Sequence, residues 1–220
     1  MFLNSIEFYS SLSSIAIAIL VGYSLGSAPL AAQISRRLGV DIFSVGNGLP
    51  GASNVFHHVG VIPALFVLLG DMSKGAITVV VGKALGLDGV LVMLPVTAAI
   101  IGHWKPMFTR FRGGDGIATL GGGTLALFPL LGLISAVIAI LITLGAQRLP
   151  YSSLLGTVIG YTTLITITTI YGGDSMSALA NVSVAGLVLT HATVGHLRRR
   201  KIVWEITDDI RGNSRGDFSG

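Results

Sequence analysis

Two oppositely charged residues inside a long apolar stretch are the first candidates for chemistry in this sequence. Asp71 and Lys74 interrupt residues 59–85, in the run Asp-Met-Ser-Lys-Gly. Ionisable groups are costly inside a membrane and by default mark a functional site there. A spacing of three places both side chains on one helix face, so each is the predicted partner of the other. A purely structural ion pair is the alternative interpretation.

A polar, glycine-rich segment at residues 41–60 is the second candidate. Its glycines, Gly46, Gly48 and Gly51, lie close together in the sequence. Backbone amides of such loops can converge on an anion, as they do in phosphate-binding loops. An ordinary turn-rich connector between two apolar stretches is the alternative.

A third candidate is the run Gly113-Gly114-Asp115-Gly116, which precedes a short apolar stretch. Glycine amides followed directly by a helix N-terminus favour an anion, because the helix dipole is positive at that end. Asp115 in the middle of the run carries a charge that opposes an anion.

Histidine is the remaining residue type that could take part in catalysis. His103, at a predicted membrane boundary, can act as an acid, a base or a phosphate ligand, although a lone histidine is more often structural. None of the five histidines has a carboxylate partner at metal-site spacing, so no metal site is predicted; they are His57, His58, His103, His191 and His196. The absence of cysteine excludes thiolate nucleophiles and disulfides.

The composition is that of an integral membrane protein. Apolar residues make up 51% of the 220 residues and charged residues 11%, less than half of the roughly 25% found in soluble domains. The net charge of +4 comes mostly from basic residues beside apolar stretches, which a cytoplasmic-face bias explains better than nucleic-acid binding. No basic residue precedes the first apolar run, so we expect that run to be a retained span rather than a signal peptide.

Six apolar stretches are close to or above the length that a membrane span requires. They cover residues 14–34, 59–85, 89–108, 117–147, 152–171 and 178–197. The fourth is too long for one span, and we expect it to break at Phe128-Pro129, because the residue before a proline disfavours helix. The sequence therefore predicts an all-α fold with about seven transmembrane helices, some of them short or broken.

The basic residues predict the orientation of these spans. If the long stretch crosses twice, Arg36, Arg110, Arg148 and Arg198 all fall on one side, which the positive-inside rule makes cytoplasmic. The N-terminus is then outside and the C-terminus cytoplasmic. We expect residues 1–201 to form a single polytopic membrane domain and residues 202–220 to be a mobile polar tail in the cytoplasm.

Three sequence blocks, in this order, resemble the bacterial membrane-embedded glycerol-3-phosphate acyltransferases of the PlsY type, which use acyl phosphate. The first family motif, D-I-R-x-x-G-S-G-N-x-G-A-T-N-V-x-R, aligns without a gap from Asp41 to His57. The second, D-x-x-K-G, matches at Asp71, Lys74 and Gly75. The third, G-H-x-F-P-x-F-x-x-F-x-G-G-K-G-V-A-T, aligns from Gly102 to Thr119. The similarity extends over nearly all of the membrane region.

The resemblance implies a seven-span fold that transfers an acyl chain from acyl phosphate to glycerol 3-phosphate and forms lysophosphatidic acid in phospholipid synthesis. It implies a location in the bacterial inner membrane among membrane lipids, and no cofactor or metal. The residues that it assigns to catalysis are Lys74, His103, His57 and Asn47. Those assigned to substrate binding are Gly46, Gly48, Gly51, Asn54, Gly113, Gly114, Asp115, Gly116 and His191. Lys74 and both loops are expected around one cavity, with His103 and His191 in its wall.

This chain differs from the family pattern at five site positions. Asn47, Leu49, His57, Asp115 and Val194 stand where the family has serine, asparagine, arginine, lysine and asparagine. The replacement of lysine by Asp115 reverses a charge, so an acyltransferase with a neutral or cationic acceptor is one alternative. A non-catalytic protein that binds lipid or a partner is another. A transporter is a third, because broken spans and intramembrane ion pairs also occur there.

Overall fold

The structure is a computed structural model that describes residues 2–146, 148 and 152–216, and within these residues it contains helices and no strand. The all-α prediction is therefore confirmed for this part of the chain. The elements are α1 (Phe2–Gly26), α2 (Leu30–Arg37), α3 (Ala52–His58), α4 (Val61–Ala84), η1 (Gly89–Val92), α5 (Met93–Trp104), η2 (Met107–Thr109), α6 (Ile117–Leu127), α7 (Pro129–Gly145), α8 (Ser152–Ile170) and α9 (Ser175–Gly216).

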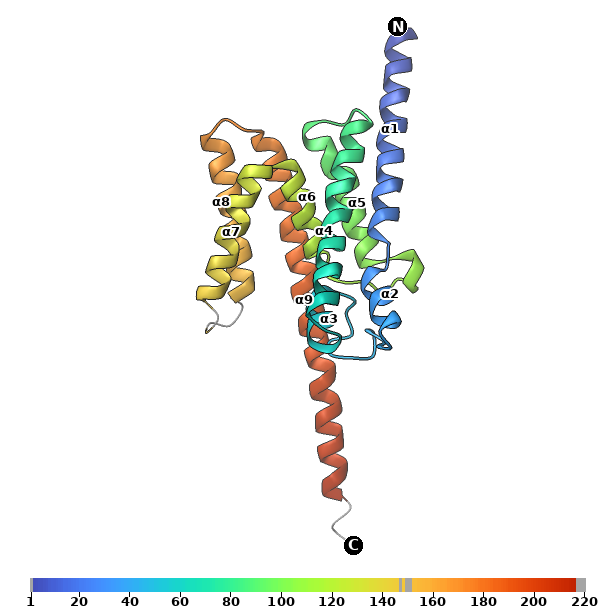
Figure 1. The fold of residues 1–220 in the computed structure, drawn as a ribbon, viewed down its shortest axis with the longest axis vertical. Helices are drawn as coiled ribbons and strands as arrows, with labels where there is room; N and C mark the ends of the chain where they lie inside the picture. Colours follow the sequence, from blue (N-terminus) through green and yellow to red (C-terminus); the bar gives the residue numbers. More distant parts are fainter. Residues whose placement is uncertain (1, 147, 149–151, 217–220) are drawn as a thin grey trace.

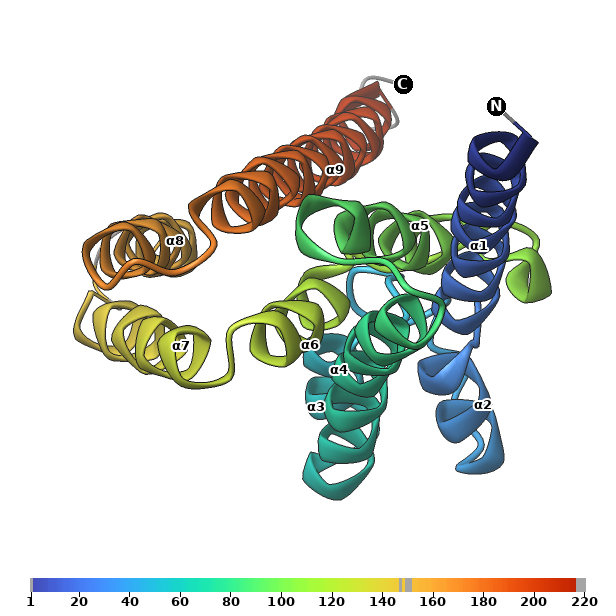
Figure 2. The same cartoon turned by 90° about the horizontal axis from the view of Figure 1, so that it is seen from above.

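The longer helices run along one axis and reverse direction at successive connections (Figure 1). α2, α3, the α5–α6 connection and the α7–α8 connection lie at one end of this bundle, together with the C-terminus. The N-terminus and the α4–α5, α6–α7 and α8–α9 connections lie at the opposite end. Viewed along the axis, α7 and α8 form a pair beside the group of α1, α4, α5 and α6 (Figure 2).

Among the described residues, four helical segments are long and apolar enough to cross a membrane, and three shorter ones are also apolar. The long segments are Ser11–Arg37, Val61–Ala84, Gly89–Thr109 and Ser175–Leu197. The shorter ones are Ile117–Leu127, Pro129–Gly145 and Leu154–Ile170. Many large apolar side chains on these helices are exposed, Leu20, Phe66, Val80 and Leu141 among them. An apolar surface of this extent is favourable in contact with lipid and unfavourable in contact with water.

Two proline-associated breaks divide the predicted spans. The predicted break at Phe128-Pro129 is confirmed, because α6 ends at Leu127 and α7 begins at Pro129. The other break interrupts the first predicted span between Gly26 and Leu30. Proline lacks an amide hydrogen and disfavours helix in the residue before it, so the chain leaves the helix there.

The crossing of α4 and α6 depends on glycine. A methyl group on Gly75 would overlap the backbone carbonyl of Thr119, and one on Gly122 would overlap that of Met72. Backbones approach this closely in membrane proteins where small residues line the contact. The crossing therefore holds the start of α6 beside the part of α4 that carries Asp71 and Lys74.

The last helix continues beyond the predicted membrane domain. We expected a mobile polar tail from residue 202, but α9 runs on as one helix to Gly216 and projects beyond the bundle (Figure 1). Extending an existing helix costs far less than nucleating a new one, and no proline follows Ser175 to end it. The last four residues of the predicted tail, and Gln147 at the end of the predicted long stretch, lie outside the described residues.

Candidate functional site

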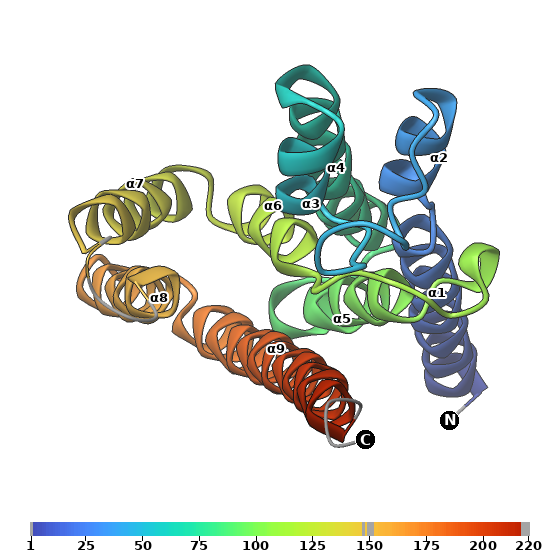
Figure 3. The ribbon, with the colours of Figure 1, turned by 90° about the horizontal axis from the view of Figure 1, so that it is seen from below.

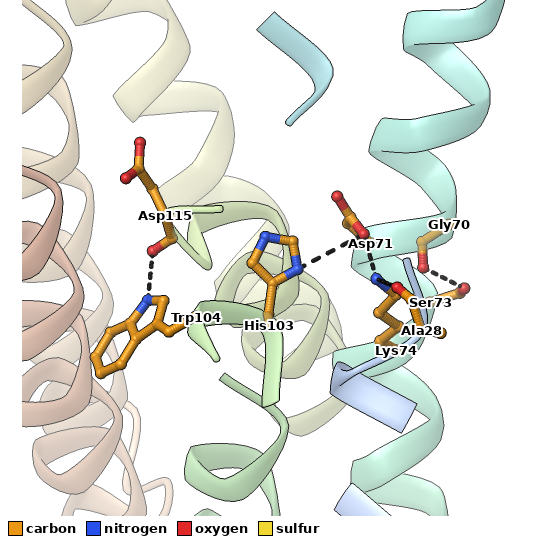
Figure 4. Close-up of polar contacts among 8 residues, drawn as sticks. All are labelled: Ala28, Gly70, Asp71, Ser73, Lys74, His103, Trp104 and Asp115. Atoms are coloured by element: carbon orange, nitrogen blue, oxygen red, sulfur yellow. Dashed lines mark hydrogen bonds and ion pairs between the residues drawn. The ribbon is translucent and has the colours of Figure 1, made fainter. Parts of the chain in front are cut away.

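The centre of the site is a buried ion pair on α4. The Lys74 ammonium donates to the Asp71 carboxylate at 2.6 Å, and only 6% and 4% of the two side chains are exposed. This confirms the predicted pairing. The same ammonium also donates to the backbone carbonyl of Ala28 at 2.6 Å (Figure 4). Because α1 ends just before Ala28, the pair connects α4 to the break between α1 and α2.

The imidazole of His103 lies on the other side of Asp71. Its Nδ1 is 3.7 Å from the Asp71 carboxylate oxygen that accepts from Lys74, and its side chain is 8% exposed. Figure 4 shows Asp71 between the histidine and the lysine. His103 is the penultimate residue of α5, so the three side chains bring together α4, α5 and the end of α1.

The loop before α6 is held directly against His103. The amide of Gly114 donates to the His103 carbonyl at 3.1 Å, and the Trp104 indole donates to the Asp115 carbonyl at 2.8 Å. A methyl group on Gly114 would overlap the imidazole Nε2, so only glycine allows this approach. The Gly114 amide is thus already bonded within the protein, and its predicted use for phosphate stays a prediction from the resemblance.

The predicted start of α6 is confirmed. Gly116 adopts a left-handed conformation, with φ at +80°, and the helix begins at Ile117. The first amides of a helix have no acceptor within the helix, and the positive end of its dipole points the same way. The favourable environment for an anion thus comes from the start of α6 more than from the glycine run.

Asn54 organises the other glycine-rich loop. Its side-chain amide, buried at the start of α3, donates to the carbonyls of Ile42, Val45 and Leu49 at 3.2, 3.1 and 3.0 Å. This donor is thus occupied by the loop itself, although the resemblance implied that Asn54 binds substrate. Asn54 therefore shapes the loop.

The loop also uses most of its own candidate anion donors. The Gly48 amide donates to Val45, the Gly51 amide to Leu49, and the Asn47 side chain accepts from the Leu49 amide. The amides of Gly48 and Gly51 are thus bonded within the loop, and their convergence on a phosphate stays a prediction. Gly46, with φ at +56°, is exposed.

Two cavities meet at Asp71 and His103. The first, here the lysine cavity, is lined by Lys74, Ala28, Pro50, Arg112, Gly113 and Gly114 in addition to the shared pair. The second, here the loop cavity, has a volume of about 240 Å³ and adds Asn47, Gly51, Asn54, Asp115, Gly116 and Ile117. The structure thus brings Lys74, His103 and parts of both loops to one place.

The charges of the two cavities differ. Cations line the lysine cavity, where Arg112 also packs its guanidinium 4.3 Å from the centre of the Phe43 ring. The loop cavity contains Asp115, whose carboxylate is turned away from the Trp104 ring (Figure 4). A third cavity of about 400 Å³ shares Ala28, Pro29 and Thr109 with the lysine cavity and adds Arg36.

Two predicted site histidines lie outside both cavities. His57 is exposed on α3, edge-on to Phe56, with the ring centres 5.2 Å apart. His191, on α9, stacks on Trp104 at 4.3 Å. The expectation that His191 forms part of the cavity wall is therefore wrong: it supports the tryptophan that holds the α6 loop. A direct role for either histidine in the reaction stays a prediction from the resemblance.

Two contributors to the site were absent from the sequence-based set of site residues. The Ala28 carbonyl was missed because backbone groups carry no residue-type signal, although the Ala28-Pro29 pair inside an apolar stretch indicated a break. Arg112 had a clearer signal, since it directly precedes the glycine run that faces the site.

Comparison with known proteins identifies the family of this chain. Residues 16–201 match the family model described as glycerol-3-phosphate acyltransferase. The chain belongs to this family. A glycerol-3-phosphate acyltransferase of Dechloromonas aromatica is 33% identical over 80% of this chain and 88% of that protein. One of Rubrobacter xylanophilus is 42% identical over 53% of this chain and 59% of its own length, so the alignment spans about three fifths of that relative.

Solved structures of a glycerol-3-phosphate acyltransferase share the fold. PlsY (YgiH), an integral membrane glycerol 3-phosphate acyltransferase, superposes with a TM-score of 0.68 and 26% identity over 89% of this chain and 93% of that one. It is known in a glycerol 3-phosphate form and in a lysophosphatidic acid form, the latter 25% identical to this chain. The present chain is therefore a multi-pass membrane member of the PlsY-type acyltransferases.

Replacing Asn54 by alanine tests its role in shaping the loop. We expect Asn54→Ala to lower the free energy of unfolding by about 1–3 kcal/mol, because buried carbonyls lose their donor. Hydrogen exchange at the Gly48 and Gly51 amides should become faster. Asn47→Ala is the matched control, because Asn47 is exposed and accepts one bond within the loop. Equal effects of both substitutions would contradict this role.

Proposed function

We propose that this protein transfers an acyl chain from acyl phosphate to the 1-hydroxyl of glycerol 3-phosphate and forms lysophosphatidic acid for phospholipid synthesis. The observation that supports this most strongly is the junction of two cavities at a buried Asp71–His103 pair, in a chain of the glycerol-3-phosphate acyltransferase family. A two-substrate transfer needs such a junction, because the hydroxyl must lie next to the acyl carbon.

His103 is the proposed general base. The hydroxyl oxygen of the acceptor attacks the acyl carbon, and its proton passes to the imidazole Nε2. The bond from the acyl carbon to the phosphate oxygen breaks, and inorganic phosphate leaves. Asp71, 3.7 Å from Nδ1, orients the ring and stabilises the imidazolium that forms. Neither a metal ion nor a covalent acyl-enzyme is part of this sequence of steps.

The two cavities suit different phosphates. We assign glycerol 3-phosphate to the lysine cavity, of about 20 Å³, together with the adjoining cavity of about 400 Å³, because Lys74 and Arg112 line the first and Arg36 lines the second. One cation about 4 Å from a phosphate charge contributes about 4 kcal/mol at an effective dielectric near 20. The acyl phosphate then occupies the loop cavity, where the start of α6 faces the leaving group.

A neutral or cationic acceptor is the second candidate, and Asp115 is the observation that favours it. This carboxylate lines the loop cavity, and Asp71 is the other acidic group there. Because Asp71 is already paired with Lys74, Asp115 is the carboxylate that disfavours an anion there and favours a hydroxyl or an ammonium group. In this candidate the two assignments exchange: the acceptor occupies the loop cavity, and the phosphate of the donor lies beside Lys74 and Arg112. The same transfer chemistry would then serve a different alcohol or amine.

We propose seven membrane crossings with the N-terminus outside, in the bacterial inner membrane. The support is the alternating direction of α1, α4, α5, α6, α7, α8 and α9 (Figure 1). One end of the bundle contains α2, with Arg36 and Arg37 in its last turn, and the α7–α8 connection, with Arg148. The positive-inside rule assigns this end to the cytoplasm. Residues 1–201 then form one membrane domain, with residues 202–220 in the cytoplasm.

An assay with purified protein tests the reaction. Acyl phosphate and labelled glycerol 3-phosphate should yield labelled lysophosphatidic acid, with glycerol and ethanolamine as competing acceptors. His103→Gln should lower kcat by about 10²–10⁴-fold, the usual contribution of a general base. His196→Gln, an exposed histidine on α9, is the matched control and should keep the activity. Acylation of glycerol or ethanolamine alone would favour the second candidate, and no acylation of any acceptor would refute the transfer.

Single-cysteine labelling tests the topology, because the native chain has no cysteine. In intact cells, an impermeant thiol reagent should modify Asp88→Cys, in the α4–α5 connection, and leave Arg148→Cys unmodified until the membrane is opened. Both positions are exposed, so access depends on the side of the membrane. Labelling of Arg148→Cys from outside would contradict two crossings between residues 117 and 147.

A further inference from the structure

An apolar cavity between α6, α7, α8 and α9 has no part in the chemistry described above. It has a volume of about 230 Å³, and its walls include Ile117, Gly121, Leu125, Ala139, Tyr161 and Leu164. Figure 3 shows the four helices around this region, with the α7–α8 pair standing away from α6. None of the described residues that line it is charged, so apolar contents suit it best.

One side chain borders both this apolar cavity and the site. Ile117, the first residue of α6, lines both the loop cavity and the apolar cavity. Met72, the neighbour of Asp71 on α4, also lines the apolar cavity. An acyl group that reacts beside His103 can therefore extend its chain past Ile117.

Part of the cavity wall is formed by tightly packed, buried side chains. Leu164, on its wall, is fully buried in a cluster with Phe128 and Ala178. The Tyr161 hydroxyl pairs with the Thr124 hydroxyl at 3.1 Å, and Thr124 also donates to Asn181 at 3.1 Å. Along α6 the cavity extends from Ile117 to Leu125, about 12 Å at the helical rise of about 1.5 Å per residue. A hexanoyl chain fits within this length, whereas decanoyl and hexadecanoyl chains must pass along all of it.

We propose that the apolar cavity holds the acyl chain of the donor and that Gly121 sets the chain length that this protein accepts. The inference rests on the proposed acyl transfer. A methyl group on Gly121 would meet no atom within 4 Å, whereas one on the adjacent Gly122 would overlap the Met72 carbonyl. Gly121 lines the cavity about one helical turn beyond Ile117. A side chain added there occupies room that a long acyl chain needs, and it does not disturb the α4–α6 crossing.

The test compares hexanoyl, decanoyl and hexadecanoyl phosphate as donors. Gly121→Leu should lower the ratio of kcat/KM for hexadecanoyl to that for hexanoyl phosphate by about tenfold, the effect of losing the burial of about two methylene groups. Gly186→Leu is the matched control, because Gly186 is also helical, has open space around its added carbon and does not line the cavity. If Gly121→Leu fails to fold, Gly121→Ala should shift the ratio in the same direction by less. An unchanged ratio in a folded, active variant would overturn the inference and leave the proposed transfer intact.

A second readout does not depend on turnover. Lysophosphatidic acids with the same three chains should raise the Tm of the native protein progressively with chain length. In Gly121→Leu, the hexadecanoyl compound should give no larger shift than the hexanoyl one. If the native protein acylates no acceptor, the proposed function fails, and this measurement alone decides the inference. Identical shift profiles in both proteins would overturn it.

Discussion

The site depends on the contact of one buried ammonium with one carboxylate and one backbone carbonyl. Lys74 bonds Asp71 and Ala28, and both charged side chains are almost fully buried. A charge inside a membrane is tolerated only when it is paired, and removing one partner of a buried pair costs about 3–5 kcal/mol. The contact therefore fixes the α1–α2 break against α4. It also holds Asp71 where it faces His103.

The rest of the site is arranged around this contact by close backbone approaches. The glycines of the α4–α6 crossing bring the start of α6 to the same depth as Asp71, and Gly114 lets the preceding loop rest on His103. The result is a series of cavities: a cationic one at Lys74, a mixed one at the loops and an apolar one beyond Ile117. These environments match the polar acceptor, the acyl phosphate and the acyl chain of the proposed reaction.

Local signals predicted part of this arrangement. The Asp71–Lys74 pair follows from a spacing of three in an apolar helix, and the break at Phe128 follows from the proline after it. The stacking of His191 on Trp104 was not predictable, because α9 has apolar residues on all sides and no face marks its rotation. The hydrogen bonds that the Gly48 and Gly114 amides donate within the protein were not predictable either, because only the folded loops bring their acceptors into range.

A double-mutant cycle at Asp71 and Lys74 tests most directly whether this contact is catalytic or only structural. Unfolding and acyl transfer are measured for Asp71→Asn, Lys74→Met and the double variant. Each single change should destabilise the protein, and the double change should recover much of the stability, because no unpaired charge remains. We predict that the stable double variant lacks transfer activity, since His103 loses its orienting carboxylate and the acceptor loses its cation. A double variant with native activity would contradict the account.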